Sequence, residues 1–290
     1  MQSKIMAHGG ELLDLYVQGD ELAMEKEQAC ANKSWDLSRR QLCDIELMLD
    51  GSFSPLEGFL SQADYQSVLE TMRLCDGTLW PMPINLDVSE KFAQAVSIGE
   101  QITLRDQEGV VIANMKVSDC WKVDKAQEAM SVFSTDDDSH PGVHYLKNES
   151  GDFYLGGTVV GVTPPLHYDF VQYRDSPRSL RESFLQKGWS NVIAFQTRNP
   201  VHRAHVIMTK RLMAENDAQF VIHSAVGLTK PGDLDHYSRV RCYEKVLAHY
   251  PADTASLSLI QLGMRMAGPR EALWQAIIRQ NYGFSHFVIG

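Results

Sequence analysis

The second half of the sequence alternates between short apolar segments and segments with helical periodicity, and this alternation restricts the fold more than any other feature. The four apolar segments, each short enough for a strand, are 191–195, 220–223, 257–262 and 286–289. Strands that alternate with helices predict a parallel sheet with right-handed crossovers. Ligands of such sheets bind beyond the carboxyl ends of the strands, so we expect function in the loops that follow them.

Capping residues indicate where the intervening helices begin. Asn199 and Pro200 fit the N-cap and the first helical position, which predicts a helix from there to about residue 216. The same reasoning predicts three more helices, over 177–187, 234–250 and 268–281. The second half is therefore expected to be an α/β domain.

The first part of the chain has a different pattern. Residues 38–72 are helical in patches, whereas 101–105 and 110–117 have strand character on either side of the turn at 106–109. A further strand with interrupting glycines is expected over 153–162. This part is therefore predicted to be an α+β domain that contains a small barrel or sheet.

The boundary between the two parts is expected at Thr163-Pro164-Pro165, because two prolines cannot continue a strand and favour an extended connection. We place a β-rich N-terminal domain over 1–168 and an α/β domain over 169–290. A length of 290 residues allows each domain its own core.

Charge and cysteine content exclude several classes of protein. The sequence has 27 Lys and Arg residues and 37 Asp and Glu residues. Its net charge of −10 is opposite to the excess positive charge that binding of nucleic acid or anionic lipid requires. The five cysteines contain no C-x-x-C pair, which favours reduced thiols and argues against a structural zinc site. No signal peptide or apolar segment of membrane-spanning length is evident. We expect a cytoplasmic protein that binds neither nucleic acid nor membrane.

The loop after the first strand of the α/β domain has the residues of an anion site. Gln196 and Arg198 lie beside a predicted helix start, whose free backbone N–H groups and dipole attract negative charge. His202 and His205 are three residues apart, so both can reach a group above the helix start.

Three interpretations of His202 and His205 compete. They can cap or pack at the helix start, they can bind a metal, or they can contact phosphates as an H-x-x-H pair of the nucleotidyltransferase kind. A metal site needs further ligands, and the nearest following carboxylate is Glu215. Arg198, Asn199 and the helix dipole nearby favour the phosphate interpretation.

The next two loops also carry cations. Lys230 follows the second strand, while Arg265 and Arg270 follow the third. A cation in the first turn of a helix is unfavourable for the helix dipole, which indicates that an anion compensates Arg270. We therefore expect consecutive strand ends to form one cationic cradle for a multiply charged anion.

Known nucleotide-site motifs are absent from the sequence. It contains no GxxxxGK[ST] P-loop, no G-x-G-x-x-G after a strand and no G-x-S-x-G nucleophile elbow. The residues therefore indicate an α/β nucleotide site without a protein nucleophile.

Several segments resemble the signature blocks of the ATP sulfurylase (sulfate adenylyltransferase) family. They are Gln196-Thr-Arg-Asn-Pro-Val-His-Arg-Ala-His205, Gly227-Leu-Thr-Lys-Pro-Gly-Asp233 and Met264-Arg-Met-Ala-Gly-Pro-Arg-Glu271, with Gly51-Ser-Phe-Ser-Pro-Leu-Glu-Gly-Phe59 near the N-terminus. The resemblance implies a PUA-like N-terminal domain followed by a Rossmann-like nucleotidyltransferase domain. It also implies a homo-oligomer that functions in sulfate assimilation or sulfur oxidation.

The resemblance assigns a role to each residue of the first loop. Gln196 and Arg198 would bind sulfate. Thr197, Arg198 and Asn199 would form the catalytic cluster and, with Gln196, contact ATP. His202 and His205 would hold the triphosphate, and Gly290 would contact ATP from the fourth strand end.

The implied reaction converts ATP and sulfate to adenylyl sulfate (APS) and pyrophosphate, or the reverse, by in-line attack on the α-phosphate. Mg²⁺ would accompany ATP without a protein metal site of its own. The family continues after its fourth strand with Gly-Arg-Asp-His-Ala-Gly, of which this sequence holds only Gly290, so we expect weak or absent turnover from this chain. The alternatives are a PUA-like RNA-binding protein and a metal-dependent hydrolase that uses His202 and His205.

Overall fold

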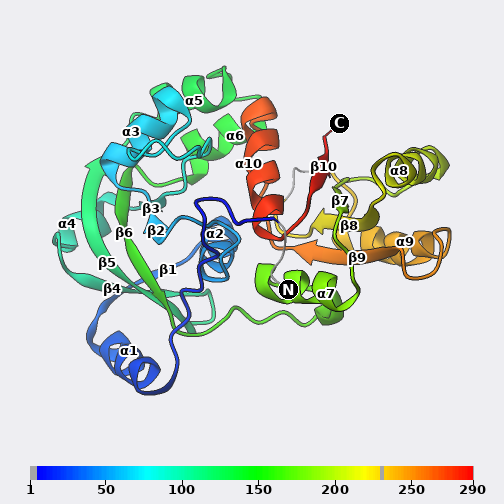
Figure 1. Cartoon of the computed structure of the whole chain (residues 1–290). Helices are drawn as coiled ribbons and strands as arrows, with labels where there is room; N and C mark the ends of the chain where they lie inside the picture. Colours follow the sequence, from blue (N-terminus) through cyan, green and yellow to red (C-terminus); the bar gives the residue numbers. More distant parts are fainter. Residues whose placement is uncertain (1–4, 229–231, 290) are drawn as a thin grey trace.

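The computed structural model describes residues 5–228 and 232–289. The chain forms two sheets, one from the N-terminal part and one from the C-terminal part, with helix α10 (Gly268–Asn281) between them (Figure 1). Lys230 and Gly290, which the sequence interpretation used, lie outside the described residues.

The N-terminal part contains a mixed sheet in the order β1-β4-β5-β6-β2, with β3 paired to β6. Strand β1 runs parallel to β4, and the other pairs are antiparallel. The elements in chain order are α1 (Gly19–Ala31), β1 (Lys33–Asp36), α2 (Arg39–Leu49), β2 (Gly58–Phe59), α3 (Gln62–Thr71), β3 (Leu86–Val88), α4 (Glu90–Ala95), β4 (Gln101–Arg105), β5 (Val111–Lys122), α5 (Lys125–Phe133), α6 (Pro141–His144), the π-helical turn η1 (Tyr145–Glu149) and β6 (Phe153–Gly161).

The predicted hairpin is confirmed as the antiparallel pair β4 and β5. Its turn is held by Asp106, whose Oδ1 accepts hydrogen bonds from the backbone N–H groups of Glu108 at 3.0 Å and Val110 at 2.8 Å. Gly109 completes the turn at φ +84°, a conformation that glycine adopts without strain.

The C-terminal part contains the predicted parallel sheet, in the order β10-β7-β8-β9. Its elements are the 3₁₀ turn η2 (Val171–Tyr173), α7 (Pro177–Gln186), β7 (Val192–Phe195), α8 (Arg203–Asn216), β8 (Gln219–Ala225), α9 (His236–Leu247), β9 (Ala255–Ile260), α10 and β10 (His286–Val288). The chain passes from β7 to β8 to β9 and then returns to place β10 on the other side of β7. The order therefore reverses between β7 and β10.

Alternate side chains of β7 face two different apolar cores. Val192 and Ala194 pack in the core that also contains Trp274 of α10 and Phe184 of α7. The other core, on the opposite face, contains Ile193 and Phe195 together with residues of α8 and α9. This alternation is the expected pattern for a strand covered by helices on both faces.

Helix α10 joins the two parts because its apolar side belongs to the core of the N-terminal part as well. The ring of Trp274 lies 5.3 Å from that of Phe53. At the other end of the helix, Asn281 donates through Nδ2 to the carbonyls of Ser52 and Ser54, each at 2.9 Å. Contacts with the N-terminal part therefore help to fix the position of α10 against the C-terminal sheet. The domain limits at 168 and 169 stay a prediction.

Candidate functional site

The reversal of strand order places the candidate site at the carboxyl ends of β7 and β10. Neighbouring loops leave a parallel sheet in opposite directions at such a point, so a crevice opens between them and ligands bind there. Gln196 follows the last residue of β7 directly, and Phe195 pairs with Val288 of β10. The loop that runs from Gln196 to the start of α8 therefore lies at the switch point of the sheet.

Gln196 is held by a buried arginine that the sequence interpretation missed. The guanidinium of Arg279, on α10, donates through Nη2 to Gln196 Oε1 and to the carbonyl of His223, the latter at 3.2 Å. Gln196 Nε2 lies 4.0 Å from Met264 Sδ. Arg279 stands among the apolar residues 277, 278 and 282 of its helix, and a charge in such a pattern is the signal that could have found it.

Thr197 and Asn199 are fixed by the phenol of Tyr243 on α9. Its hydroxyl donates to the carbonyl of Thr197 at 2.9 Å and to that of Asn199 at 3.2 Å. The backbone N–H of Asn199 donates to Thr197 Oγ1 at 3.1 Å. These bonds hold a bend at residues 198 and 199, and the side chain of Asn199 is exposed.

The predicted start of α8 at Asn199 and Pro200 is wrong. The helix begins at Arg203 with His202 as the N-cap. The physical reason is that the carbonyls of Thr197 and Asn199 accept hydrogen bonds from Tyr243, and an additional irregular turn therefore precedes the helix. His202 and His205 consequently lie at the N-cap and the third helical position.

His202 and His205 form the expected pair at this helix start. Their ring centroids are 3.9 Å apart, and the backbone N–H of His202 donates to His205 Nδ1 at 3.4 Å. Burial, with His202 as a second cause, lowers the pKa of His205. A neutral ring that accepts at Nδ1 carries its proton on Nε2, so His205 offers one N–H donor beyond the helix start.

Arg198 is not a free cation in this structure. Its Nη1 lies 3.1 Å from a carboxylate oxygen of Asp233, in the loop after β8. The Asp233 side chain is 10% exposed and that of Arg198 is 32% exposed, so an anion can reach the arginine without displacing it into solvent. The sequence interpretation did not anticipate this pair.

Two cations of the predicted cradle have other partners. Arg265 is buried and pairs with Asp44 of α2 at 2.5 Å. Arg270 donates to the carbonyls of Leu69 at 2.7 Å and Val68 at 3.1 Å, and to that of Pro81 at 3.3 Å. Both arginines therefore hold the N-terminal part against the C-terminal sheet, and the prediction that they form an anion cradle is wrong.

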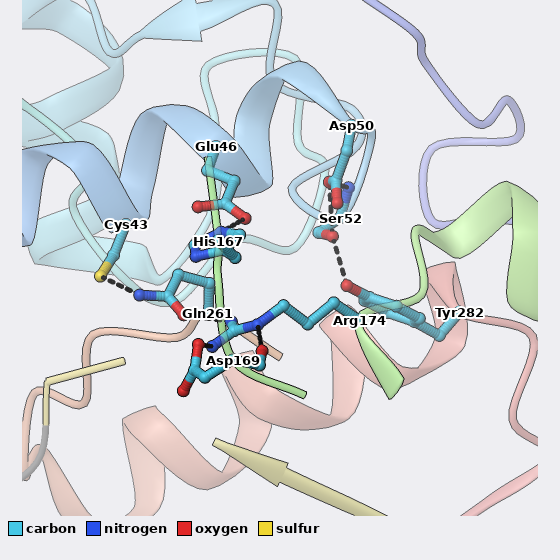
Figure 2. A network of polar contacts seen from close by, with 9 residues as sticks. All are labelled: Cys43, Glu46, Asp50, Ser52, His167, Asp169, Arg174, Gln261 and Tyr282. Carbon is cyan, nitrogen blue, oxygen red and sulfur yellow. Dashed lines mark hydrogen bonds and ion pairs between the residues drawn. The ribbon is translucent and has the colours of Figure 1, made fainter. Parts of the chain in front are cut away.

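A pocket of about 490 Å³ lies between the two parts of the chain. It is lined by Val226 and Gly227 after β8 and by Gln261 after β9, but not by Gln196. The polar residues around it form a network between α2, the connection at 163–175 and the C-terminal sheet (Figure 2). Within this network, Arg174 bonds to Asp169 at 2.7 Å and to Gln261 at 2.9 Å.

The described residues contain no group of three or more His, Cys, Asp or Glu side chains that could hold a metal ion. Across 5–228 and 232–289 there is also no helix long and apolar enough to cross a membrane. The donors gathered at the switch point are an amide, a hydroxyl, a guanidinium and imidazoles. Such a set suits oxyanions better than a bare cation.

Comparisons with known proteins identify both parts of the chain. The family model described as PUA-like domain matches residues 5–164, and the one described as ATP-sulfurylase matches residues 171–290. A sulfate adenylyltransferase of Schizosaccharomyces pombe is 52% identical over 256 residues, which are 88% of this chain and 52% of that protein. The Saccharomyces cerevisiae sulfate adenylyltransferase is 48% identical over 98% of this chain and 56% of its own length.

A solved structure shares the whole architecture. The hexameric APS kinase from Thiobacillus denitrificans superimposes with a TM-score of 0.83 at 31% identity, covering 99% of this chain and 52% of that one. The chain thus spans about half the length of the curated relatives that it matches. The comparisons support neither an RNA-binding protein nor a metal-dependent hydrolase. The chain belongs to the ATP-sulfurylase family, with a PUA-like domain ahead of its α/β domain.

Proposed function

We propose that the protein is a sulfate adenylyltransferase, which converts ATP and sulfate to APS and pyrophosphate or catalyses the reverse reaction. The observation that carries the proposal is the loop at the switch point, where Gln196, Arg198 and the pair His202 and His205 follow β7 in the order of the family's block. Relatives with 48–52% identity bear this name.

The reaction needs charge neutralisation more than a protein base. A sulfate oxygen bonds to the α-phosphorus of ATP while the bond from that phosphorus to the β-bridging oxygen breaks, and pyrophosphate carries away the electron pair. Sulfate is already deprotonated at neutral pH, so no proton needs to be removed from it. Two polyanions must instead be brought together, which cationic and N–H donors at fixed positions achieve.

Each residue of the loop has a proposed task. Gln196 and Arg198 bind sulfate, and Arg198 exchanges part of its contact with Asp233 for the anion. Thr197, Arg198 and Asn199 form the catalytic cluster beside the α-phosphate. The neutral His205 donates its Nε2–H to the phosphates together with His202. Gly290, which lies outside the described residues, remains a proposed ATP contact.

ATP is proposed to enter as its Mg²⁺ complex. Among the described residues no carboxylate cage is formed at the switch point, and the acidic side chain of Asp233 there is engaged by Arg198. Mg²⁺ bound to phosphate oxygens and water needs few protein ligands. The metal is therefore part of the substrate in this proposal.

The test is sulfate-dependent release of pyrophosphate from ATP by the purified protein. Arg198→Ala should lower kcat/KM about 100- to 1,000-fold, as expected for loss of one charged donor at the reacting group. Arg211→Ala is the matched control, because Arg211 is 80% exposed and pairs with Glu215 on its own helix. Absence of sulfate-dependent pyrophosphate release from the wild-type protein would refute the proposed function.

A cytoplasmic location and a homo-oligomeric state complete the proposal. All five cysteines are free thiols, which suits a reducing compartment. The similar protein of known structure is hexameric. Fractionation of cells and light scattering of the purified protein test these two points.

A further inference from the structure

Arg279 is a buried cation directly behind the proposed sulfate site. It is 1% exposed, and its guanidinium lies 5.0 Å from the ring centroid of Phe287 on β10. Its Nη2 reaches Gln196 Oε1 and the carbonyl of His223. One helix side chain therefore touches the neighbouring strands β10 and β8 and the first residue after β7.

The guanidinium has no carboxylate partner among the described residues, and its Nε and Nη1 lack hydrogen-bond partners there. Burial lowers the pKa of Arg279 to about 10, so it remains charged at neutral pH. A buried charge that is only partly satisfied is costly and is seldom kept for stability alone. The hydrogen bond from Arg279 to Gln196 Oε1 links this charge to the proposed sulfate site.

The contact fixes which end of the Gln196 amide faces the site. Arginine can only donate hydrogen bonds, so the oxygen of the amide must point to Arg279 and its NH₂ group must point away. Nε2 faces Met264 Sδ at 4.0 Å, which is a weak acceptor. At least one N–H of Gln196 is thus available to an incoming ligand.

We propose that Arg279 is a positioning residue that makes Gln196 present its N–H donors, and not its carbonyl oxygen, to sulfate. The inference rests on the proposed function. Without Arg279 the amide can rotate by half a turn and present an oxygen, which repels an anion.

Steady-state kinetics of Gln196→Met, Arg279→Met and the double variant test the proposal. Each single variant should raise the sulfate KM by about 10- to 100-fold, as expected for loss of a charge-assisted contact, and change the ATP KM less than about threefold. The double variant should be no worse than the worse single variant, because Arg279 acts through Gln196. Arg279→Lys should retain most of the sulfate affinity, since lysine can donate to the same oxygen.

Two further variants keep the test decisive if Arg279→Met folds poorly. Gln196→Glu places a carboxylate against Arg279, so it should fold normally yet lose sulfate affinity at least as strongly as Gln196→Met. Arg181→Met is the matched control, because Arg181 donates at 2.7 Å to the carbonyls of Gln280 and Asn281 at the end of α10 without touching Gln196. It should leave the sulfate KM unchanged.

Independent, multiplying losses in the double variant, or an equal rise of both substrate KM values, would overturn the role of Arg279. So would an Arg181→Met effect on the sulfate KM that equals that of Arg279→Met. Failure of the proposed function is recognised separately, as a wild-type protein without sulfate-dependent pyrophosphate release. In that case anion binding can be measured without turnover. The Tm of each variant is measured in sodium sulfate and in sodium chloride of equal ionic strength, and a higher Tm in sulfate reports sulfate binding.

Discussion

Arg270→Met is expected to loosen the junction between the two parts of the protein and to leave anion binding unchanged. Arg270 lies in the first turn of α10, where its charge opposes the helix dipole. The structure shows what compensates it, because the guanidinium donates to Val68 and Leu69 in the last turn of α3. A cation is favourable at that end of a helix.

The size of the effect follows from three hydrogen bonds to carbonyl groups at 2.7, 3.1 and 3.3 Å. A hydrogen bond to a charged group contributes about 1.5–3 kcal/mol, but the three share one guanidinium and Arg270 is only partly buried. Water can also reach the carbonyls when the side chain is removed. We therefore expect the free energy of unfolding to fall by about 2–3 kcal/mol in total, which corresponds to roughly 4–8 °C in Tm.

Urea denaturation followed by tryptophan fluorescence measures this loss, since Trp274 of α10 and Trp80 are both in the shared core. Arg270→Lys should give an intermediate loss, because an ammonium group spans fewer of the carbonyls. The reasoning would be refuted by an Arg270→Met protein of unchanged stability whose sulfate KM rises tenfold or more, since that result would make Arg270 a ligand of the anion.

Three other changes have expected outcomes. Burial raises the pKa of Asp50 to about 8, so between about pH 4 and pH 8 this carboxyl group is ionised in the unfolded chain but protonated in the folded protein. The free energy of unfolding should therefore fall by up to about 1.4 kcal/mol for each pH unit of increase in this range. Urea denaturation at several pH values measures this slope, and Asp50→Asn should remove it. Asp44→Ala leaves Arg265 buried without its partner, and calorimetry should show a loss of about 3–5 kcal/mol that Asp44→Asn only partly restores. Asp233→Asn frees Arg198 at the site, so the sulfate KM should fall or stay the same, and a large rise would show that Asp233 orients the arginine.

The central strands β7 and β8 of the C-terminal sheet were predictable from sequence because they are buried on both faces. Such strands are rich in apolar residues, and the segments at 191–195 and 220–223 stand out from the polar helices around them. The helix that begins at Pro177 was equally clear, since Ser176 caps it through a hydrogen bond from the Ser179 N–H. These features depend on residues that are close together in the sequence, so contacts with distant residues did not alter them.

The start of α8 and the partners of the arginines depend on contacts between distant residues. Tyr243 follows Asn199 by more than forty residues, and its hydroxyl group takes the carbonyls that would have begun the helix. The guanidinium of Arg270 donates to a carbonyl of α3 in the N-terminal part and so points away from the anion site. A sequence pattern shows that a cation lies near a strand end, but it does not show in which direction the side chain points.

The same geometry explains why the cation behind the site was missed. Arg198 was predicted as a site residue because it lies in a loop, and loops often carry functional residues. Arg279 lies inside a helix among apolar residues, where an arginine commonly extends its charged group to solvent. The strand order decides its role, because β10 returns beside β7 and brings the α10 side chain that precedes it under Gln196. Helix α10 connects β9 to β10, so the connection that creates the switch point also carries the buried cation of Arg279 to the site. Arg279, more than two turns into α10, is therefore better placed to act on the site than Arg270 in the first turn, which contacts α3.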